Sequence, residues 1–157
     1  MNLYCNGILK QLNLAAETVI SFIRILEPAD LEVRPTPGKH SVGELLVHLS
    51  VLCVADWKIS SGASLEDMET FYAENEPPCA LPAIEQALRL NVARLEQETS
   101  SLTDEQLSAV TTSYWGASYS RYEWLVETLA HFYHHRGQLH AMLVHSLGKD
   151  PSIPLFA

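Results

Sequence analysis

The chain has 157 residues, of which 47% are hydrophobic, and 19 acidic side chains stand against 10 basic ones for a net charge of −9. This length and composition exclude a disordered chain and favour one domain over residues 1–157 with a sizeable core. The acidic balance disfavours a nucleic-acid binder, and the lack of eighteen consecutive apolar residues predicts no membrane span.

The first apolar segment does not resemble a signal peptide, because Lys10, Glu17 and Arg24 interrupt it. Three cysteines without a CxxC spacing are typical of free thiols in a reducing compartment. We therefore expect a cytoplasmic protein.

Apolar residues recur every three or four positions from residue 3 to about 26, which predicts the first helix. A connection with three prolines (Pro28, Pro35 and Pro37) ends it. The second helix begins at the capping box of Ser41 and Glu44 and runs to about residue 59. Residues 60–81 then lose the pattern and predict a long crossover, with at most one helical turn near residues 65–72.

The third helix is predicted from Pro82 to about residue 99. A capping box at Thr103 begins a short helix that ends near residue 110, and the aromatic segment 111–119 is expected to be a loop with at most one extended piece. The last helix begins at the capping box of Ser120 and Glu123 and ends at Gly148. The pattern predicts an all-α fold: a four-helix bundle with a long crossover between helices 2 and 3.

Histidines are concentrated in the last helix, five of them between residues 131 and 145. At about 100° per residue, His135 lies about 40° from His131 beside the apolar stripe, so both can bind one metal ion. His48, among inward leucines of the second helix, is the candidate third ligand. Three imidazoles leave coordination positions open, as in catalytic metal sites.

Several alternatives stay open on spacing alone. His134 competes with His131, and a lone His48 on an apolar stripe is more often a hydrogen-bonded core residue. Arg136 is expected either to neutralise an anionic ligand or, more in keeping with its position, to pair at the bundle edge or a subunit contact. His40 is expected to be exposed. The remaining polar candidates have ordinary interpretations as solvated or packing residues: His140, His145 and the acidic run 66–76.

The segments SVGELLVHLS (residues 41–50) and LAHFYHHRGQLHAML (residues 129–143) resemble the DinB/YfiT-like superfamily, which is regarded as a group of metalloenzymes. The resemblance assigns the ligand roles to His48, His131 and His135, and thereby prefers His131 over His134. It also implies a four-helix bundle, one divalent metal ion (zinc or nickel), and a homodimer.

The resemblance further implies a metal-dependent enzyme acting on a small molecule, either a transferase or isomerase that uses a low-molecular-weight thiol or a hydrolase. Glu127 or His134 is the candidate base. The alternative is a non-catalytic, stress-related helical protein that binds a metal or another ligand. Substrate choice is expected to depend on the crossover and on residues 114–119.

Overall fold

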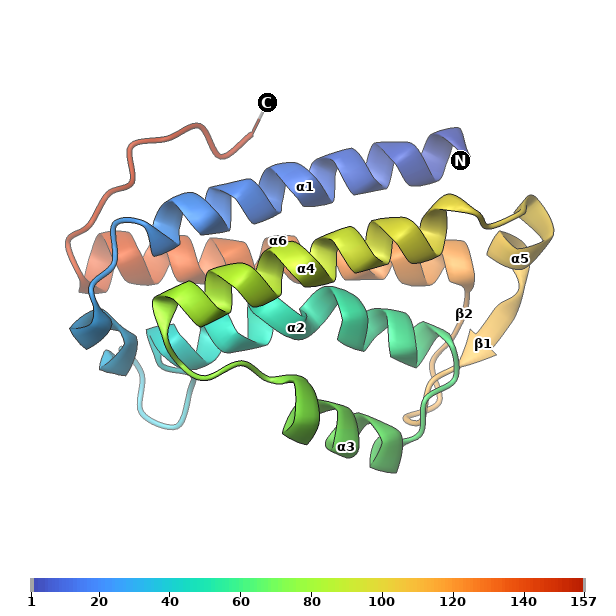
Figure 1. The fold of residues 1–157 in the computed structure, drawn as a ribbon, viewed down its shortest axis with the longest axis horizontal. Helices are drawn as coiled ribbons and strands as arrows, with labels where there is room; N and C mark the ends of the chain where they lie inside the picture. Colours follow the sequence, from blue (N-terminus) through green and yellow to red (C-terminus); the bar gives the residue numbers. More distant parts are fainter. Residues whose placement is uncertain (1, 157) are drawn as a thin grey trace.

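Helices make up most of the computed structural model, which describes residues 2–156 (Figure 1). In chain order the α-helices and strands are α1 (Leu3–Ile23), α2 (Val42–Ser60), α3 (Leu65–Asn75), α4 (Leu81–Ser100), α5 (Asp104–Ser108), β1 (Val110–Thr112), β2 (Ser118–Ser120) and α6 (Arg121–Ala141). A short 3-10 helix, Pro28–Glu32, lies between α1 and α2. Across residues 2–156, no helix combines the length and hydropathy that a membrane span requires.

The four long helices pack side by side. Both α2 and α1 contact α4 and α6. In Figure 1, α1 and α6 run in one direction, whereas α2 and α4 run in the other. The chain therefore returns between α2 and α4 before it continues, and α3 lies on this return path against α2.

Capping boxes begin the helices as the sequence predicts at Ser41, Thr103 and Ser120. A fourth box corrects the prediction for the crossover, which contains an eleven-residue helix rather than a single turn. There the Ser64 side chain accepts from the backbone N–H of Asp67, and the Asp67 carboxylate accepts from the N–H of Ser64. Because Met68 and Phe71 lie on one face three residues apart and are buried, α3 packs onto α2.

A larger hydrophobic cluster fills the space between the four long helices, and a smaller one lies beneath α3. The smaller cluster joins Val51, Ala55 and Ile59 of α2 to Phe71 of α3 and Trp124 of α6. Apolar residues of α2 are thus buried on more than one side of the helix. Polar side chains in such surroundings are uncommon, so those on α2 are candidates for a functional role.

The segment expected to be a loop with one extended piece forms a hairpin instead. Strands β1 and β2 pair antiparallel, with Thr111 opposite Tyr119. Gly116 has a φ of +96°, a conformation that glycine adopts without steric cost, and this allows the chain to turn between the strands. The hairpin packs against α6, where the Trp124 indole N–H donates to the Thr111 carbonyl, because two short strands alone are only marginally stable.

The last helix is α-helical only to Ala141 and continues as a π-helical segment, Met142–Ser146, before Gly148 at a φ of +64°. Beyond it the C-terminal segment folds back over Arg136, which is buried and donates to the Leu155 carbonyl at 2.6 Å. The rings of Tyr133 and Phe156 lie 4.2 and 4.9 Å from the guanidinium carbon. Arg136 therefore binds the C-terminal segment through Leu155 and Phe156.

Candidate metal centre

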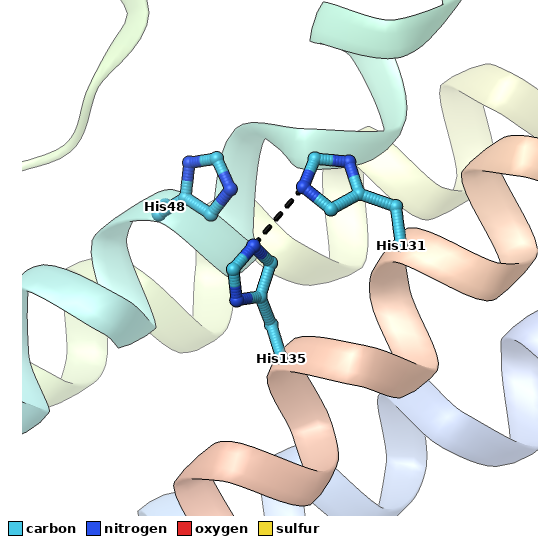
Figure 2. Close-up of side chains that lie close together, drawn as sticks. All are labelled: His48, His131 and His135. Atoms are coloured by element: carbon cyan, nitrogen blue, oxygen red, sulfur yellow. Dashed lines mark hydrogen bonds between the residues drawn. The ribbon is translucent and has the colours of Figure 1, made fainter.

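Three imidazoles converge where α2 faces α6 (Figure 2). His48 projects from α2, and His131 and His135 project from consecutive turns of α6. One nitrogen from each ring lies within 4.8 Å of the others. The three residues that the sequence singles out therefore lie at one point in the fold.

Two of the three rings are oriented by hydrogen bonds on their outer nitrogens. His131 Nδ1 lies 3.0 Å from Asp56 Oδ2, and His135 Nδ1 lies 2.7 Å from Gln138 Oε1. A metal-binding histidine commonly donates its other N–H to an oxygen in this way, which fixes both the tautomer and the ring orientation. Asp56 and Gln138 therefore direct both Nε2 atoms to the same place.

The hydrogen-bond partners of His131 and His135 determine which nitrogen of each ring carries the hydrogen. The carboxylate and the amide oxygen only accept, so each Nδ1 carries the hydrogen and each Nε2 of a neutral ring presents a lone pair. Yet the two Nε2 atoms lie 3.0 Å apart. Two facing lone pairs repel unless a cation lies between them, and that cation is either a shared proton or a metal ion.

The spacing of these nitrogens suits one ion. Nitrogens bound tetrahedrally at 2.0–2.1 Å from zinc lie about 3.3 Å apart, close to the observed 3.0 Å between His131 and His135. The His48 ring lies 4.7 Å from the His135 ring, centroid to centroid, and nearly perpendicular to it. The donor set and its spacing fit a divalent cation.

The surroundings of the three rings shift their pKa values in different directions. Burial, with the neighbouring His135 and His131, lowers the pKa of His48 to about 4. Burial likewise lowers the pKa of His135, whereas the hydrogen bond to Asp56 raises the pKa of His131. His48 is consequently neutral near pH 7, with a free lone pair to offer.

The other predicted residues lie around this cluster rather than in it. His134 is exposed and its ring lies 5.0 Å from that of His135, but it is not one of the three converging residues. His40 is exposed, as expected, although its ring stacks 6.1 Å from His48. His140 packs against Phe22 and His145 is exposed, so neither belongs to the site.

Asp56 is the functional residue that the sequence reasoning missed. Its side chain is only 15% exposed and lies on α2, eight residues after His48. The available signal was a carboxylate inside the apolar stretch 45–59, since an acid in such surroundings requires a partner.

Two separate cavities border the cluster, one at His131 and the other at His135. One, of about 590 Å³, has His131, His134, Glu127 and Asp56 in its wall. Its remaining wall comes from α2 and α6, from Tyr72 of α3 and from the hairpin, so both segments on which substrate choice is expected to depend contribute to it. The second cavity, of about 620 Å³, contains His135, Gln138, His40 and Lys39. The cluster is therefore accessible to small molecules from two directions.

Replacing Asp56 by asparagine is expected to weaken binding of Zn²⁺ about 10- to 100-fold, the usual cost of losing a residue that orients a metal ligand. The asparagine keeps the size of the side chain but removes the charge that holds His131 in one tautomer. Competition with a chromogenic chelator measures the affinity. Glu66→Gln, which neutralises an exposed acid on α3, is the matched control and is expected to leave the affinity for Zn²⁺ unchanged. An unchanged affinity in Asp56→Asn would show that Asp56 does not support the site.

Comparison with known proteins shows which family this chain matches. The profile of the DinB superfamily matches residues 11–139. The crystal structure of a protein assigned to the DinB family, from Exiguobacterium sibiricum, has a TM-score of 0.85 and 32% identity, covering 99% of both chains. None of the curated proteins matches the chain.

Two more distant structures share the fold. A DinB-like protein from Bacillus cereus has a TM-score of 0.70 at 20% identity, covering 91% of this chain and 92% of its own. Another from Bacillus subtilis has a TM-score of 0.67 at 17% identity, covering 98% of this chain and 96% of its own. At these identities the likeness concerns the fold alone.

Proposed function

Because this chain belongs to the DinB superfamily, we propose that it is a metal-dependent enzyme that binds one divalent cation through His48, His131 and His135 and acts on a small molecule. The observation that carries the proposal is the pair of Nε2 atoms facing each other at 3.0 Å while their Nδ1 atoms face acceptors. Zinc or nickel is the expected ion, since both accept imidazole ligands.

We also propose that the four long helices form the family's four-helix bundle, with the α2–α4 connection as its crossover, and that residues 1–157 form one domain. The homodimer and the cytoplasmic location stay predictions from the sequence.

A divalent cation held by His48, His131 and His135 would supply Lewis-acid activation of a nucleophile, water or thiol, near pH 7. The chain's own residues have the other roles. Asp56 and Gln138 orient two of the ligands, and Glu127 or His134, both in the wall of the 590 Å³ cavity, accepts the proton that the nucleophile loses.

The second cavity supports a thiol as cosubstrate. Lys39 lies in its wall together with His135 and Gln138. An ammonium group at this position can pair with the carboxylate of an anionic low-molecular-weight thiol while the sulfur points towards the histidines. The two cavities thus provide separate places for the thiol and for the molecule that it attacks, which favours transfer over hydrolysis.

The test is a thiol-transfer assay with protein purified without a histidine tag, stripped of metal and reloaded with Zn²⁺ or Ni²⁺. Glutathione attacks 1-chloro-2,4-dinitrobenzene: a C–S bond forms, chloride leaves with its electron pair, and the thiol proton passes to the base. We expect the metal-loaded protein to be at least about 10-fold faster than the stripped protein, because a free thiol is only a few per cent thiolate at pH 7 and the ion would raise that fraction.

Lys39→Gln separates the role of the second cavity from that of the metal. This variant is expected to raise the KM for glutathione, which carries carboxylates, and to leave the KM for uncharged 2-mercaptoethanol unchanged. A protein that binds the metal but transfers neither thiol, and hydrolyses no ester, would instead be the non-catalytic binder.

A further inference from the structure

Besides Tyr72, four aromatic side chains line the cavity beside His131, three of them from the segment that forms the β1–β2 hairpin. Their centroids form a chain in which Tyr114 lies 4.7 Å from Trp115, Trp115 lies 6.0 Å from Trp124, and Trp124 lies 4.9 Å from Tyr119. Successive rings are inclined at 86°, 90° and 75°. Because neighbouring rings are nearly perpendicular, their faces point into the cavity region from different directions.

Packing fixes the base of this group, while its outer rings remain open. Trp124 is 4% exposed and donates its indole N–H to the Thr111 carbonyl at 3.2 Å. In contrast, Tyr114, Trp115 and Tyr119 are 47%, 55% and 39% exposed, although the core offers apolar surface nearby. Exposed aromatic residues gathered at a cavity mark a binding surface.

The charged side chains in this cavity are acidic. Asp56 and Glu127 contribute carboxylates, and among residues 2–156 no lysine or arginine lines it. The titratable neighbours His131 and His134 lie at the end where the histidines converge. Burial and the nearby Asp56 raise the pKa of Tyr72 to about 12, so this phenol stays neutral. Asp56 pairs with His131, whereas Glu127 has no ion-pair partner within the described part of the chain.

We propose that the cavity binds a small organic cation, an ammonium group whose alkyl substituents contact Trp115 and its neighbouring rings while Glu127 balances its charge. Aromatic faces attract such cations, and quaternary ammonium groups are commonly recognised by aromatic cages. A volume of about 590 Å³ suits a molecule of this size. This inference rests on the proposed function, since it names the substrate class for the cavity that adjoins the histidines.

The bound cation occupies the hairpin end of the cavity and takes Glu127 as its counter-ion, which leaves His134 as the base of the proposed function. Glu127 precedes His131 by one turn of α6, on the side of the hairpin. The remainder of the substrate then extends towards the three histidines. The opposite signs of the two cavities, acidic here and basic around Lys39, keep an anionic thiol and a cationic substrate on separate sides.

Three probes of nearly equal shape test the proposal by quenching of tryptophan fluorescence and by calorimetry. They are choline, its neutral analogue 3,3-dimethylbutan-1-ol, and the anion 3,3-dimethylbutanoate. We expect choline to bind at least about 10-fold more tightly than the alcohol, and the anion to bind most weakly. Equal binding of choline and the alcohol, or tighter binding of the anion, would overturn the proposal.

Variants locate the binding. Trp115→Leu is expected to weaken choline binding about 2- to 30-fold, the range of a cation–π contact, and Glu127→Gln about 2- to 5-fold. Tyr4→Leu is the matched control, because it removes a strongly exposed aromatic ring that does not line this cavity. It is expected to leave the affinity for choline unchanged. Loss of choline binding in Tyr4→Leu but not in Trp115→Leu would place the site elsewhere and contradict the proposal.

The measurement is made on metal-free and on zinc-loaded protein, with zinc affinity determined separately. Choline binding without zinc binding would remove the proposed function and keep the cation site. Zinc binding without choline binding would remove the cation site and keep the metal centre.

Discussion

Alanine at His48, His131 or His135 is expected to lower the affinity for Zn²⁺ by more than about 100-fold, because loss of a residue that only orients a ligand already costs 10- to 100-fold. All three rings offer a nitrogen to the same point, so the three losses should be similar in size. Chelator competition on protein without a histidine tag measures the affinity, and circular dichroism verifies that each variant is folded.

His134→Ala is the decisive control for this experiment. His134 is the neighbour that spacing alone leaves as a competing ligand, yet it is exposed and lies outside the converging cluster. We expect His134→Ala to bind Zn²⁺ as the unaltered chain does, and His145→Ala, an exposed histidine after α6, to do the same. A strong loss in His134→Ala with retention in His131→Ala would exchange the two roles and refute the ligand set.

The parts of this site that sequence can predict are those within one helix. His131 and His135 are four residues apart, and helix geometry alone brings them together. His48 depends on the packing of α2 against α6, which no local pattern contains. Its place among inward leucines makes it a candidate, and its ligand role rests more on the family resemblance. Asp56 shows the same difficulty, because it lies about 80° around α2 from His48 and reaches His131 only through the contact between helices.

The β1–β2 hairpin and the full length of α3 were not predicted, for different reasons. Three-residue strands such as β1 and β2 show too few alternations to predict pairing, although Gly116 marks the turn. Helix α3 did carry a signal, since Ser64 and Asp67 form a capping box with aspartate in place of the glutamate or glutamine that the other boxes have. Both elements contribute to the cavity wall, so the least predictable segments are those that bear on the substrate.

Phe132→Ala is expected to lower the free energy of unfolding by about 3–5 kcal/mol, the usual cost of removing a fully buried phenylalanine. The ring is completely buried, and no small rearrangement can fill the space, because the cluster around it draws on all four long helices. The free energy of unfolding of such a domain is about 5–15 kcal/mol in total, so this substitution removes a large share of it.

The position of Phe132 also connects this loss to the metal centre. It lies next to His131 on α6 but faces the core, so its packing fixes the rotation of the helix that aims both α6 histidines. Urea unfolding measures the stability, and saturating Zn²⁺ should recover part of it, because the ion binds only the folded chain. Val126→Ala, at a 42% exposed position of the same helix, should change the stability by less than about 0.5 kcal/mol. Equal effects of the two substitutions would contradict this account of how the core positions the site.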